Sequence, residues 1–454
     1  MLKAETLYHS TNFKAPAVTF REALLKGLAP DGGLYMPRRL PLFTPRELEE
    51  ISGLSYPLLA YEIIGRILGK EIDSNDLERI CSEIYTFTVP VERISEREYL
   101  MRLDQGPTAS FKDFAALLMG RLMQYFLRLD ERHITILTAT SGDTGSAVAN
   151  AFHGLENIKV VILFPSGEVT NLQRKQMTTF NDNIVAAEID GKFDDCQRLV
   201  KTAFMDPELS GLNLSSANSI NIGRLLPQSV YYFRAWAAIS RNPGDQVTFS
   251  VPSGNFGNLS GGLLAREMGL PVKRFVAATN ANDEVPRFLK TGAYTPVSPS
   301  RNCISSAMNV GHPSNLSRII SMYDGRMDEK GTIIHPPDIQ RMNQDLFGAS
   351  ISDDVTRDTI RSFYMQYGKI LEPHGAVAWA GLLEYTGLNH ETQGDSFVCL
   401  ETAHPAKFSD EIKGILGIEP ELPDSLRSIE SRKEEFISLE NNYEQFKKLL
   451  IQNY

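Results

Sequence analysis

From residue 99 onward the sequence alternates short apolar runs with segments long enough for a helix, and this alternation restricts the possible folds more than any other feature. The runs ITILTA and VVILF are nearly all apolar, and similar runs return as QVTFSVP, RFVAATN and SFVCL. Strands of this kind are buried on both faces of a parallel sheet, with helices as crossovers. The pattern therefore predicts an α/β protein with doubly wound sheets and right-handed crossovers.

The segment before this alternation is mainly helical in pattern. Candidate helices lie in TPRELEEISGL, PLLAYEIIGRILG and SNDLERICSEIYTF, with Thr44 and Ser74 as N-terminal caps. After about Pro423 the chain is charged (SIESRKEEFISLENNYEQFKKLL), which predicts a terminal helix packed on the outside. We therefore expect a helical N-terminal domain over residues 1–95.

Charge and cysteine usage exclude several classes of protein. With 46 Lys and Arg against 56 Asp and Glu, the net charge is −10, which argues against nucleic acid as the main partner but not against a small anion. The four cysteines are far apart, and the eight histidines lack H-E-x-x-H or H-x-H spacing, so we expect no disulfide framework and no metal site. No apolar run is long enough for a membrane span and no targeting signal stands out, so we expect a cytoplasmic protein without a membrane partner.

Small polar loops follow three of the predicted strands. They are SGDTG (141–145), SGNFGN (253–258) and ETAHPAKF (401–408). Ligands of open α/β sheets sit at the carboxyl ends of the strands, where these loops lie. SGNFGN leads into a helix, so its backbone N–H groups and the helix N-terminus suit a phosphate. Plainer interpretations stay open: glycine is often needed for a tight strand–helix turn, and Ser, Asp and Thr also serve as simple helix caps.

Two further stretches could bind a second anion. Arg174 and Lys175 stand side by side in FPSGEVTNLQRKQMTTF, and SANSINIGR carries Asn218, Ser219 and Arg224. Amide and guanidinium donors suit phosphate oxygens. A solvated helix face and a polar turn are the competing interpretations.

Lys112, in GPTASFKDF, is the candidate nucleophile. It follows a Gly-Pro turn and begins an apolar helix, a setting that disfavours the ammonium form and favours the free amine that forms Schiff bases. Most lysines at helix starts are exposed, so this feature alone is weak. Together with a phosphate loop on the same sheet edge, it predicts pyridoxal phosphate as the cofactor.

The sequence resembles the threonine synthases of yeast and many bacteria, which are fold-type II pyridoxal-phosphate enzymes related to tryptophan synthase β. The resemblance covers nearly the whole chain and is carried by FREALLKGLAPDGGLYMP, GPTASFKDF, TSGDTGSA, SANSINIGRLLPQ, SGNFGN and ETAHPAKF. It implies two doubly wound sheets, in a large domain (96–119 and 216–454) and a smaller mobile domain (120–215).

The resemblance also implies roles for single residues. Lys112 is then the Schiff-base lysine, and Thr402 places a hydroxyl on the ring nitrogen, which leaves that nitrogen less fully protonated than an aspartate would. Asp143 lies near the cofactor 3′-oxygen, and Ser141 and Thr144 near the substrate carboxylate. The cofactor phosphate loop comprises Gly254, Asn255, Phe256, Gly257 and Asn258. The residues expected to bind the substrate phosphate are Lys175, Asn218, Ser219 and Arg224.

The implied reaction converts O-phospho-L-homoserine and water to L-threonine and phosphate, with no obligate protein partner. A phospho-lyase that releases phosphate and a 2-oxo acid from O-phosphothreonine or O-phosphohomoserine would use the same residue types. A serine/threonine dehydratase and a non-catalytic binding protein compete with both of these functions. The additional anion donors disfavour the dehydratase, and the presence of Lys112, the glycine loop and Thr402 disfavours the binding protein.

Overall fold

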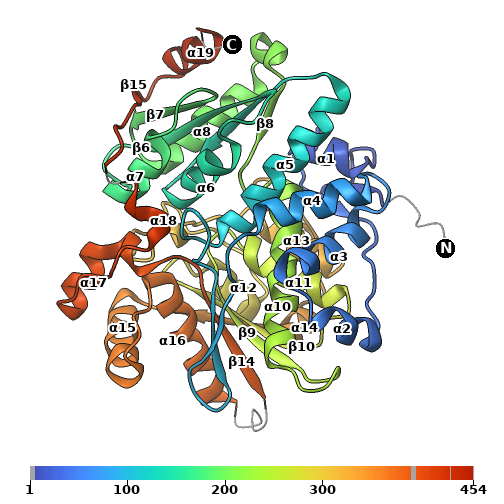
Figure 1. The fold of residues 1–454 in the computed structure, drawn as a ribbon, viewed down its shortest axis with the longest axis vertical. Helices are drawn as coiled ribbons and strands as arrows, with labels where there is room; N and C mark the ends of the chain where they lie inside the picture. Colours follow the sequence, from blue (N-terminus) through green and yellow to red (C-terminus); the bar gives the residue numbers. More distant parts are fainter. Residues whose placement is uncertain (1–5, 390–394, 430, 453–454) are drawn as a thin grey trace.

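The computed structural model describes residues 6–389, 395–429 and 431–452, which form two sheets of mainly parallel strands and a helical N-terminal segment (Figure 1). The N-terminal segment pairs β1 (Tyr8–Ser10) with β2 (Tyr35–Pro37) and then continues as helices. Its helices are α1 (Phe20–Lys26), α2 (Pro45–Ser52), α3 (Tyr56–Leu68) and α4 (Ser74–Ile84).

The capping residues of the N-terminal helices were only partly predictable. Thr44 caps α2 through a capping box with Glu47, as the sequence predicts. At α4 the cap is Asp73 and Ser74 is the first helical residue, because the Asp73 carboxylate accepts the N–H groups of Asn75 and Asp76. The expected cap at Ser74 was therefore wrong by one position.

The larger sheet has the strand order β13-β10-β9-β14-β4-β3, and only the β3–β4 pair is antiparallel. One face is covered by α16 (Pro373–Leu388), which packs on β9, β10 and β14. The strands are β3 (Val91–Arg93), β4 (Glu98–Arg102), β9 (Val247–Pro252), β10 (Val272–Thr279), β13 (Leu346–Ser350) and β14 (Ser396–Glu401). Three of the predicted apolar runs, QVTFSVP, RFVAATN and SFVCL, therefore form the centre of this sheet as β9, β10 and β14.

The smaller sheet has the order β15-β7-β6-β5-β8, and all its pairs are parallel. Alternate residues of β6 face opposite helices: Val161 and Leu163 pack with α8, whereas Val160 and Ile162 pack with α6. Burial on both faces explains why these strands are apolar throughout. The elements are β5 (Ile134–Ala139), α6 (Asp143–Phe152), β6 (Ile158–Pro165), α7 (Asn171–Thr178), β7 (Ile184–Asp190), α8 (Phe193–Met205) and β8 (Leu214–Ser216).

The C-terminal tail differs from the sequence expectation. ISLE, predicted to be helical, forms β15 (Ile437–Glu440), which pairs with β7, and α19 (Tyr443–Gln452) packs on α8 (Figure 1). The tail thus lies with the smaller sheet, although the expected division placed it in the large domain. The free edge of β7 supplies the backbone partners that the short, charged stretch cannot provide for itself. The other domain boundaries stay predictions.

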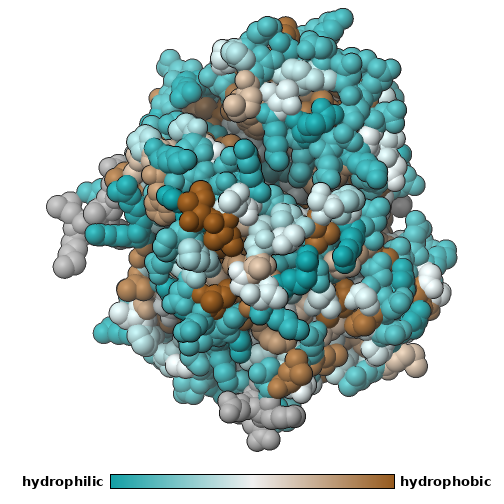
Figure 2. Space-filling model, turned by 180° about the vertical axis from the view of Figure 1, so that it is seen from behind, coloured by the Kyte–Doolittle hydropathy of each residue, from teal (hydrophilic) through white to brown (hydrophobic). Residues whose placement is uncertain are grey.

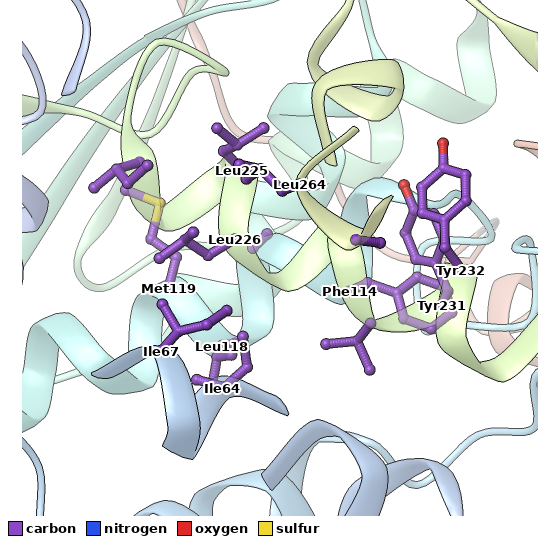
Figure 3. Packing of buried hydrophobic residues seen from close by; sticks show 14 of the residues in the cluster. Ile64, Ile67, Phe114, Leu118, Met119, Leu225, Leu226, Tyr231, Tyr232 and Leu264 are labelled. Atoms are coloured by element: carbon purple, nitrogen blue, oxygen red, sulfur yellow. The ribbon is translucent and has the colours of Figure 1, made fainter. Parts of the chain in front are cut away.

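A buried cluster holds α5 (Lys112–Asp130) against the rest of the molecule. Phe114, Leu118 and Met119 of this helix pack with side chains of α3, α9 (Ile222–Leu225), η2 (Leu226–Ser229), α10 (Val230–Ile239) and α11 (Gly257–Glu267) (Figure 3). Phe114 is fully buried. Burying one such side chain stabilises a fold by roughly 1.5–3 kcal/mol. The helix that carries Lys112 is therefore firmly anchored.

The face seen in Figure 2 is mostly hydrophilic, with apolar side chains in small groups. Among the described residues, no helix combines the length and apolar character needed to cross a bilayer, and no three metal-ligating side chains cluster. The remaining elements are α12 (Glu284–Thr291), α13 (Leu316–Met322), β11 (Arg326–Met327), β12 (Ile333–His335), α14 (Ile339–Asp345), α15 (Asp353–Tyr367), α17 (Ser409–Leu416), α18 (Asp424–Arg427), η1 (Pro207–Leu212), η3 (Ser306–Met308) and η5 (Pro405–Phe408).

Candidate active site

Lys112 begins α5 and lies beside the loop that follows β14. Phe111 donates its backbone N–H to the carbonyl of Thr402 (2.9 Å), and His404 donates its N–H to the carbonyl of Ala109 (3.0 Å). Ala109, in the turn before Lys112, has the left-handed backbone conformation that is uncommon for residues other than glycine, with a φ of 53°. These bonds bring together the predicted sites at Lys112 and Thr402, which are far apart in the sequence.

The turn before Lys112 is held by Asp113. Its carboxylate accepts the backbone N–H (2.9 Å) and the hydroxyl (2.6 Å) of Thr108. Gly106 packs so closely on this carboxylate that a Cβ there would lie 2.4 Å from Oδ2. Burial raises the pKa of Asp113 to about 6, although the bonds from Thr108 oppose the rise. Asp113 thus fixes the Lys112 backbone without touching its amine.

Two buried lysines share one carboxylate in this site. Lys407 Nζ lies 2.7 Å from Asp143 Oδ1, and Lys112 Nζ lies 3.4 Å from Asp143 Oδ2. Gln173 donates to Oδ1 over 2.9 Å, and Lys407 also donates to the Thr108 carbonyl (2.9 Å). Lys407 has no exposed side-chain area, and the Lys112 side chain is 13% exposed. Asp143 is therefore a counter-ion to both amines.

Burial is the main reason that Lys112 favours its neutral form. Burial lowers the pKa of Lys112, and Lys407 and Arg224 lower it further against the attraction of Asp143. Burial opposes ionisation of Asp143, but the neighbouring ammonium groups and hydrogen bonds hold its pKa well below the usual range. Asp143 is thus an anion, and Lys407 is the closer ionic partner. The sequence reasoning missed Lys407 and Gln173, because neither lies near Asp143 in the chain.

The loop between β9 and α11 has the form of an anion cradle. Among the described residues, the backbone N–H groups of 254–259 donate to no protein acceptor. Phe256 has a φ of 59°, and a Cβ on Gly254 would lie 2.7 Å from the Cα of Met308. Free N–H groups at the start of a helix suit a phosphate.

The asparagine side chains of this loop hold its shape. Asn255 accepts the backbone N–H of Ser314 (2.7 Å) and donates to the hydroxyl of Ser219 (2.7 Å). Asn258 accepts hydroxyl bonds from Tyr231 (2.6 Å) and Tyr232 (2.7 Å). The loop therefore offers backbone groups to an anion, and Ser219 is brought against it.

Arg224 is a buried cation on α9. One guanidinium nitrogen donates to the carbonyl of Ala217 (2.6 Å), while Nε is buried and has no partner among the described residues. Burial lowers the pKa of Arg224 to about 10. No carboxylate in the described chain forms a salt bridge with it. Because a buried charge is normally paired, Arg224 is well suited to a ligand anion.

Four further residues are candidates for substrate binding, namely Ser141, Thr144, Lys175 and Asn218. Ser141 and Thr144 are half-buried on either side of Asp143 at the start of α6. Asn218 donates to the carbonyl of Ala139 (2.8 Å), which ties the end of β8 to β5. Lys175 is half-buried on α7.

Arg174, which the sequence suggested as an anion donor beside Lys175, instead pairs with Glu434 from the tail through two hydrogen bonds (2.9 and 3.0 Å). An arginine held bidentately by a carboxylate is already neutralised, so Arg174 is not available to a ligand.

These residues fit pyridoxal phosphate on chemical grounds. The site supplies a buried amine biased toward its neutral form, a helix N-terminus with free N–H groups, and a buried hydroxyl on Thr402. Pyridoxal phosphate requires an amine, an anion site and a partner for its ring nitrogen, and the site offers a group of each chemical kind.

Comparison with known proteins agrees with this chemistry. Residues 7–85 match the family described as threonine synthase N terminus, residues 83–402 the family of pyridoxal-phosphate dependent enzymes, and residues 376–450 the family described as threonine synthase, C-terminal. The chain is 42% identical to threonine synthase of Haemophilus influenzae, over 91% of this chain and 93% of that protein.

Solved structures of threonine synthases are also similar to this chain. A pyridoxal-phosphate-bound threonine synthase from Brucella melitensis is 37% identical, with a TM-score of 0.91 over 98% of this chain and 99% of that one. Threonine synthase from Escherichia coli is 38% identical, with a TM-score of 0.88 over 99% and 100%.

Proposed function

The chain belongs to the threonine synthase family of pyridoxal-phosphate-dependent enzymes, and on that premise we propose that it converts O-phospho-L-homoserine and water into L-threonine and phosphate. The observation that carries the choice of a phosphorylated substrate is Arg224. This buried guanidinium on α9 has an unpartnered Nε, and the N–H groups of 254–259 form a second set of donors before α11, so the site offers two sets of anion donors.

The cofactor, when bound, supplies the electron sink that lets the substrate lose its α-proton. Lys112 holds the cofactor and, once displaced by substrate, moves protons at Cα, Cβ and Cγ. Asp143 and Lys407 set the charge around this amine. The N–H groups of 254–259 bind the cofactor phosphate, and Thr402 faces the ring nitrogen.

We assign the substrate to the opposite side of the site. Ser141 and Thr144, at the start of α6, hold its carboxylate, and Arg224 with Lys175, Asn218 and Ser219 holds its phosphate. Closure of a smaller domain over 120–215 excludes water until the leaving phosphate has departed. The proposal includes a cytoplasmic location and no nucleic-acid, membrane or obligate protein partner, as expected from the sequence.

The rival is the phospho-lyase, which would use the same lysine, loop and anion donors. The two reactions differ in whether water adds at Cβ before product leaves. The test is to incubate the purified holoenzyme with O-phospho-L-homoserine and analyse amino acids, 2-oxo acids and phosphate. Threonine equimolar with phosphate supports the synthase, whereas 2-oxobutyrate with phosphate would move the protein to the lyase reaction.

Arg224→Ala tests the assignment of the substrate phosphate. We expect the half-saturating concentration of O-phospho-L-homoserine to rise at least about tenfold, since a charge-assisted contact contributes roughly 1.5–3 kcal/mol. Cofactor affinity, measured by the visible absorbance band, should change much less. Unchanged saturation by substrate would remove Arg224 from the phosphate site.

A further inference from the structure

Arg318 on α13 is a second buried cation, and it contacts the loop that carries Ser219. This arginine has no exposed area. Its Nη1 donates to the carbonyl of Ser219 (2.8 Å), and its Nη2 donates to the carbonyl of Ile220 (2.7 Å). Nε donates to the carbonyl of Tyr35 (3.3 Å), and Nη1 also donates to the side-chain oxygen of Asn315 (2.6 Å). The planar guanidinium therefore binds two consecutive carbonyl groups of one loop.

All four acceptors of Arg318 are neutral oxygen atoms. Within the described ranges, no carboxylate forms a salt bridge with this guanidinium. Burial lowers the pKa of Arg318 to about 9, so the group stays protonated at neutral pH. Buried charges are normally paired with a charge of opposite sign. Arg318 and Arg224 thus both bind carbonyl groups of residues 217–220 without a protein carboxylate to neutralise them.

The bonds from Arg318 fix the direction of a backbone N–H group. Ser219 and Ile220 are the central residues of a turn in which the N–H of Asn221 donates to the carbonyl of Asn218 (3.1 Å). The carbonyl and N–H of a trans peptide point in opposite directions, so the Ile220 N–H points away from Arg318. In the part of the chain that the structure describes, the N–H groups of Ser219 and Ile220 have no acceptor, and both residues are only half-buried. These N–H groups are therefore open to a ligand.

The hydroxyl of Ser219 has a free proton for the same ligand. The backbone N–H of Ser314 can only donate, so the Asn255 side-chain atom that it contacts at 2.7 Å is the amide oxygen. The other atom is then the amide nitrogen, which donates to Ser219 Oγ over 2.7 Å. Because the hydroxyl accepts this bond, its own proton stays available to an anion.

The N-terminal motif FREALLKGLAPDGGLYMP supports this loop. Its Leu24 carbonyl accepts the side-chain amide of Asn221 (2.9 Å), and its Tyr35 carbonyl accepts Nε of Arg318. Gly27 lies so close that a Cβ there would be 3.1 Å from Asn221 Nδ2. The motif therefore serves the loop through its backbone and its close packing.

We propose that Arg318 is a positioning residue for substrate binding, because its bonds to the carbonyls of Ser219 and Ile220 turn the Ile220 N–H toward the substrate phosphate. Arg318 itself does not touch the substrate and acts through the peptide bond between these two residues. The phosphate then receives this N–H, the Ser219 hydroxyl and the Arg224 guanidinium. This inference rests on the proposed function, which assigns the substrate phosphate to Ser219 and Arg224.

The direct test is the amide signal of Ile220 in the wild-type holoenzyme, with inorganic phosphate as the probe. Serine labelled with ¹³C at the carbonyl and isoleucine labelled with ¹⁵N restrict the NMR spectrum to Ser–Ile peptide bonds, at 219–220, 350–351 and 428–429. Ile220→Val removes one signal and so assigns it. On addition of phosphate we expect the Ile220 amide proton to move downfield. The N–H groups of Ile351 and Ile429 already donate to backbone carbonyls, so their signals should stay in place.

Arg318→Met tests whether the arginine orients this peptide bond. We expect the affinity of the holoenzyme for phosphate, measured by titration calorimetry, to fall at least about tenfold, as when one hydrogen bond to a charged group is lost. The downfield shift of Ile220 should disappear, while the visible band of the bound cofactor is retained. Arg274→Met is the matched control, since Arg274 is a half-buried arginine on β10 that also donates to backbone carbonyls, those of Asn343 and Leu346. It should leave phosphate affinity unchanged.

Two outcomes would overturn the inference. One is an Ile220 signal that stays in place at saturating phosphate, which decides the question even if Arg318→Met does not fold. The other is unchanged phosphate affinity in a folded Arg318→Met protein. The product assay separates this inference from the proposed function. Threonine formation without a shift of Ile220 refutes only the positioning role, whereas a shift that depends on Arg318 in a protein that makes no threonine refutes only the reaction.

Discussion

Lys407 should control how readily Lys112 attaches the cofactor, and Lys407→Met isolates that effect. The two amines lie on opposite oxygens of Asp143, at 2.7 and 3.4 Å. Methionine keeps the length and apolar stem of lysine but removes its charge. Asp143 keeps Lys112 and Gln173 as partners, so the buried carboxylate is not left alone.

The size of the effect follows from the geometry. Adding the width of a carboxylate to the two distances places the ammonium nitrogens at most about 8 Å apart. With an effective dielectric constant of about 20, two unit charges at that separation repel by about 2 kcal/mol. One pKa unit corresponds to about 1.4 kcal/mol, so removal of Lys407 should raise the pKa of Lys112 by about one to two units.

The assay follows cofactor attachment to protein from which the cofactor has been removed. The rate at which the visible absorbance band returns is measured against pH, and its midpoint reports the free amine of Lys112. For Lys407→Met we expect the midpoint to move to higher pH by about one to two units. Asp143→Asn, which removes the attraction, should move it to lower pH.

Lys413→Met is a matched control for the same assay, because Lys413 is an exposed lysine on α17 that pairs with Glu419. It should leave the midpoint unchanged. If Lys407→Met shifted the midpoint downward or not at all, the assignment of Lys407 as the charge that depresses Lys112 would be wrong.

Three further changes have defined outcomes. Lys112→Ala should abolish the visible band of lysine-bound cofactor while leaving thermal unfolding nearly unchanged; a retained band would exclude Lys112 as the attachment site. Gly254→Ala should weaken cofactor binding by about tenfold or more, since its Cβ meets the backbone of Met308 and overpacking costs roughly 1–3 kcal/mol; equal affinity in a titration would show that the loop yields. For Asp113, whose folded pKa of about 6 lies above the unfolded value near 4, wild type should lose about 2 kcal/mol relative to Asp113→Asn as pH rises from about 4 to 6. Urea unfolding across that range checks this, and a constant difference would refute it.

Features that depend on local sequence were predictable. Runs such as ITILTA and SFVCL form strands, because burial on both faces leaves no place for polar side chains. The loops after β9 and β14 could be assigned to one region, because ligands gather at the carboxyl ends of parallel strands. The loop after β5 belongs to the smaller sheet, and the contact between Asp143 and Lys407 joins it to the same site. The adjacency of Lys112 and Thr402 follows from the same rule and is visible in the bond from Phe111 to Thr402.

Features that depend on distant partners were not predictable. Lys407 is part of ETAHPAKF, but its role in the site depends on its ion pair with Asp143. The two residues are far apart in the sequence, so no motif predicts that pair. Arg174 looked like an anion donor because its partner, Glu434, lies far away in the C-terminal tail. The sequence pattern of that tail predicts a helix and gives no sign that it returns to α7. Glu372 is an ordinary helix cap by sequence, and only the structure shows its hydrogen bond with Thr402.

The position of β14 has a consequence for how the molecule is made. This strand lies between β9 and β4, so residues 98–102 cannot join the larger sheet until residues 396–401 have been synthesised. Thr402 and Lys407 follow immediately after. A growing chain on the ribosome therefore exposes Lys112 long before the other half of its pocket exists. With the proposed role of Lys112, capture of pyridoxal phosphate is expected only in a nearly complete polypeptide, so its absorbance should distinguish finished molecules from truncated ones.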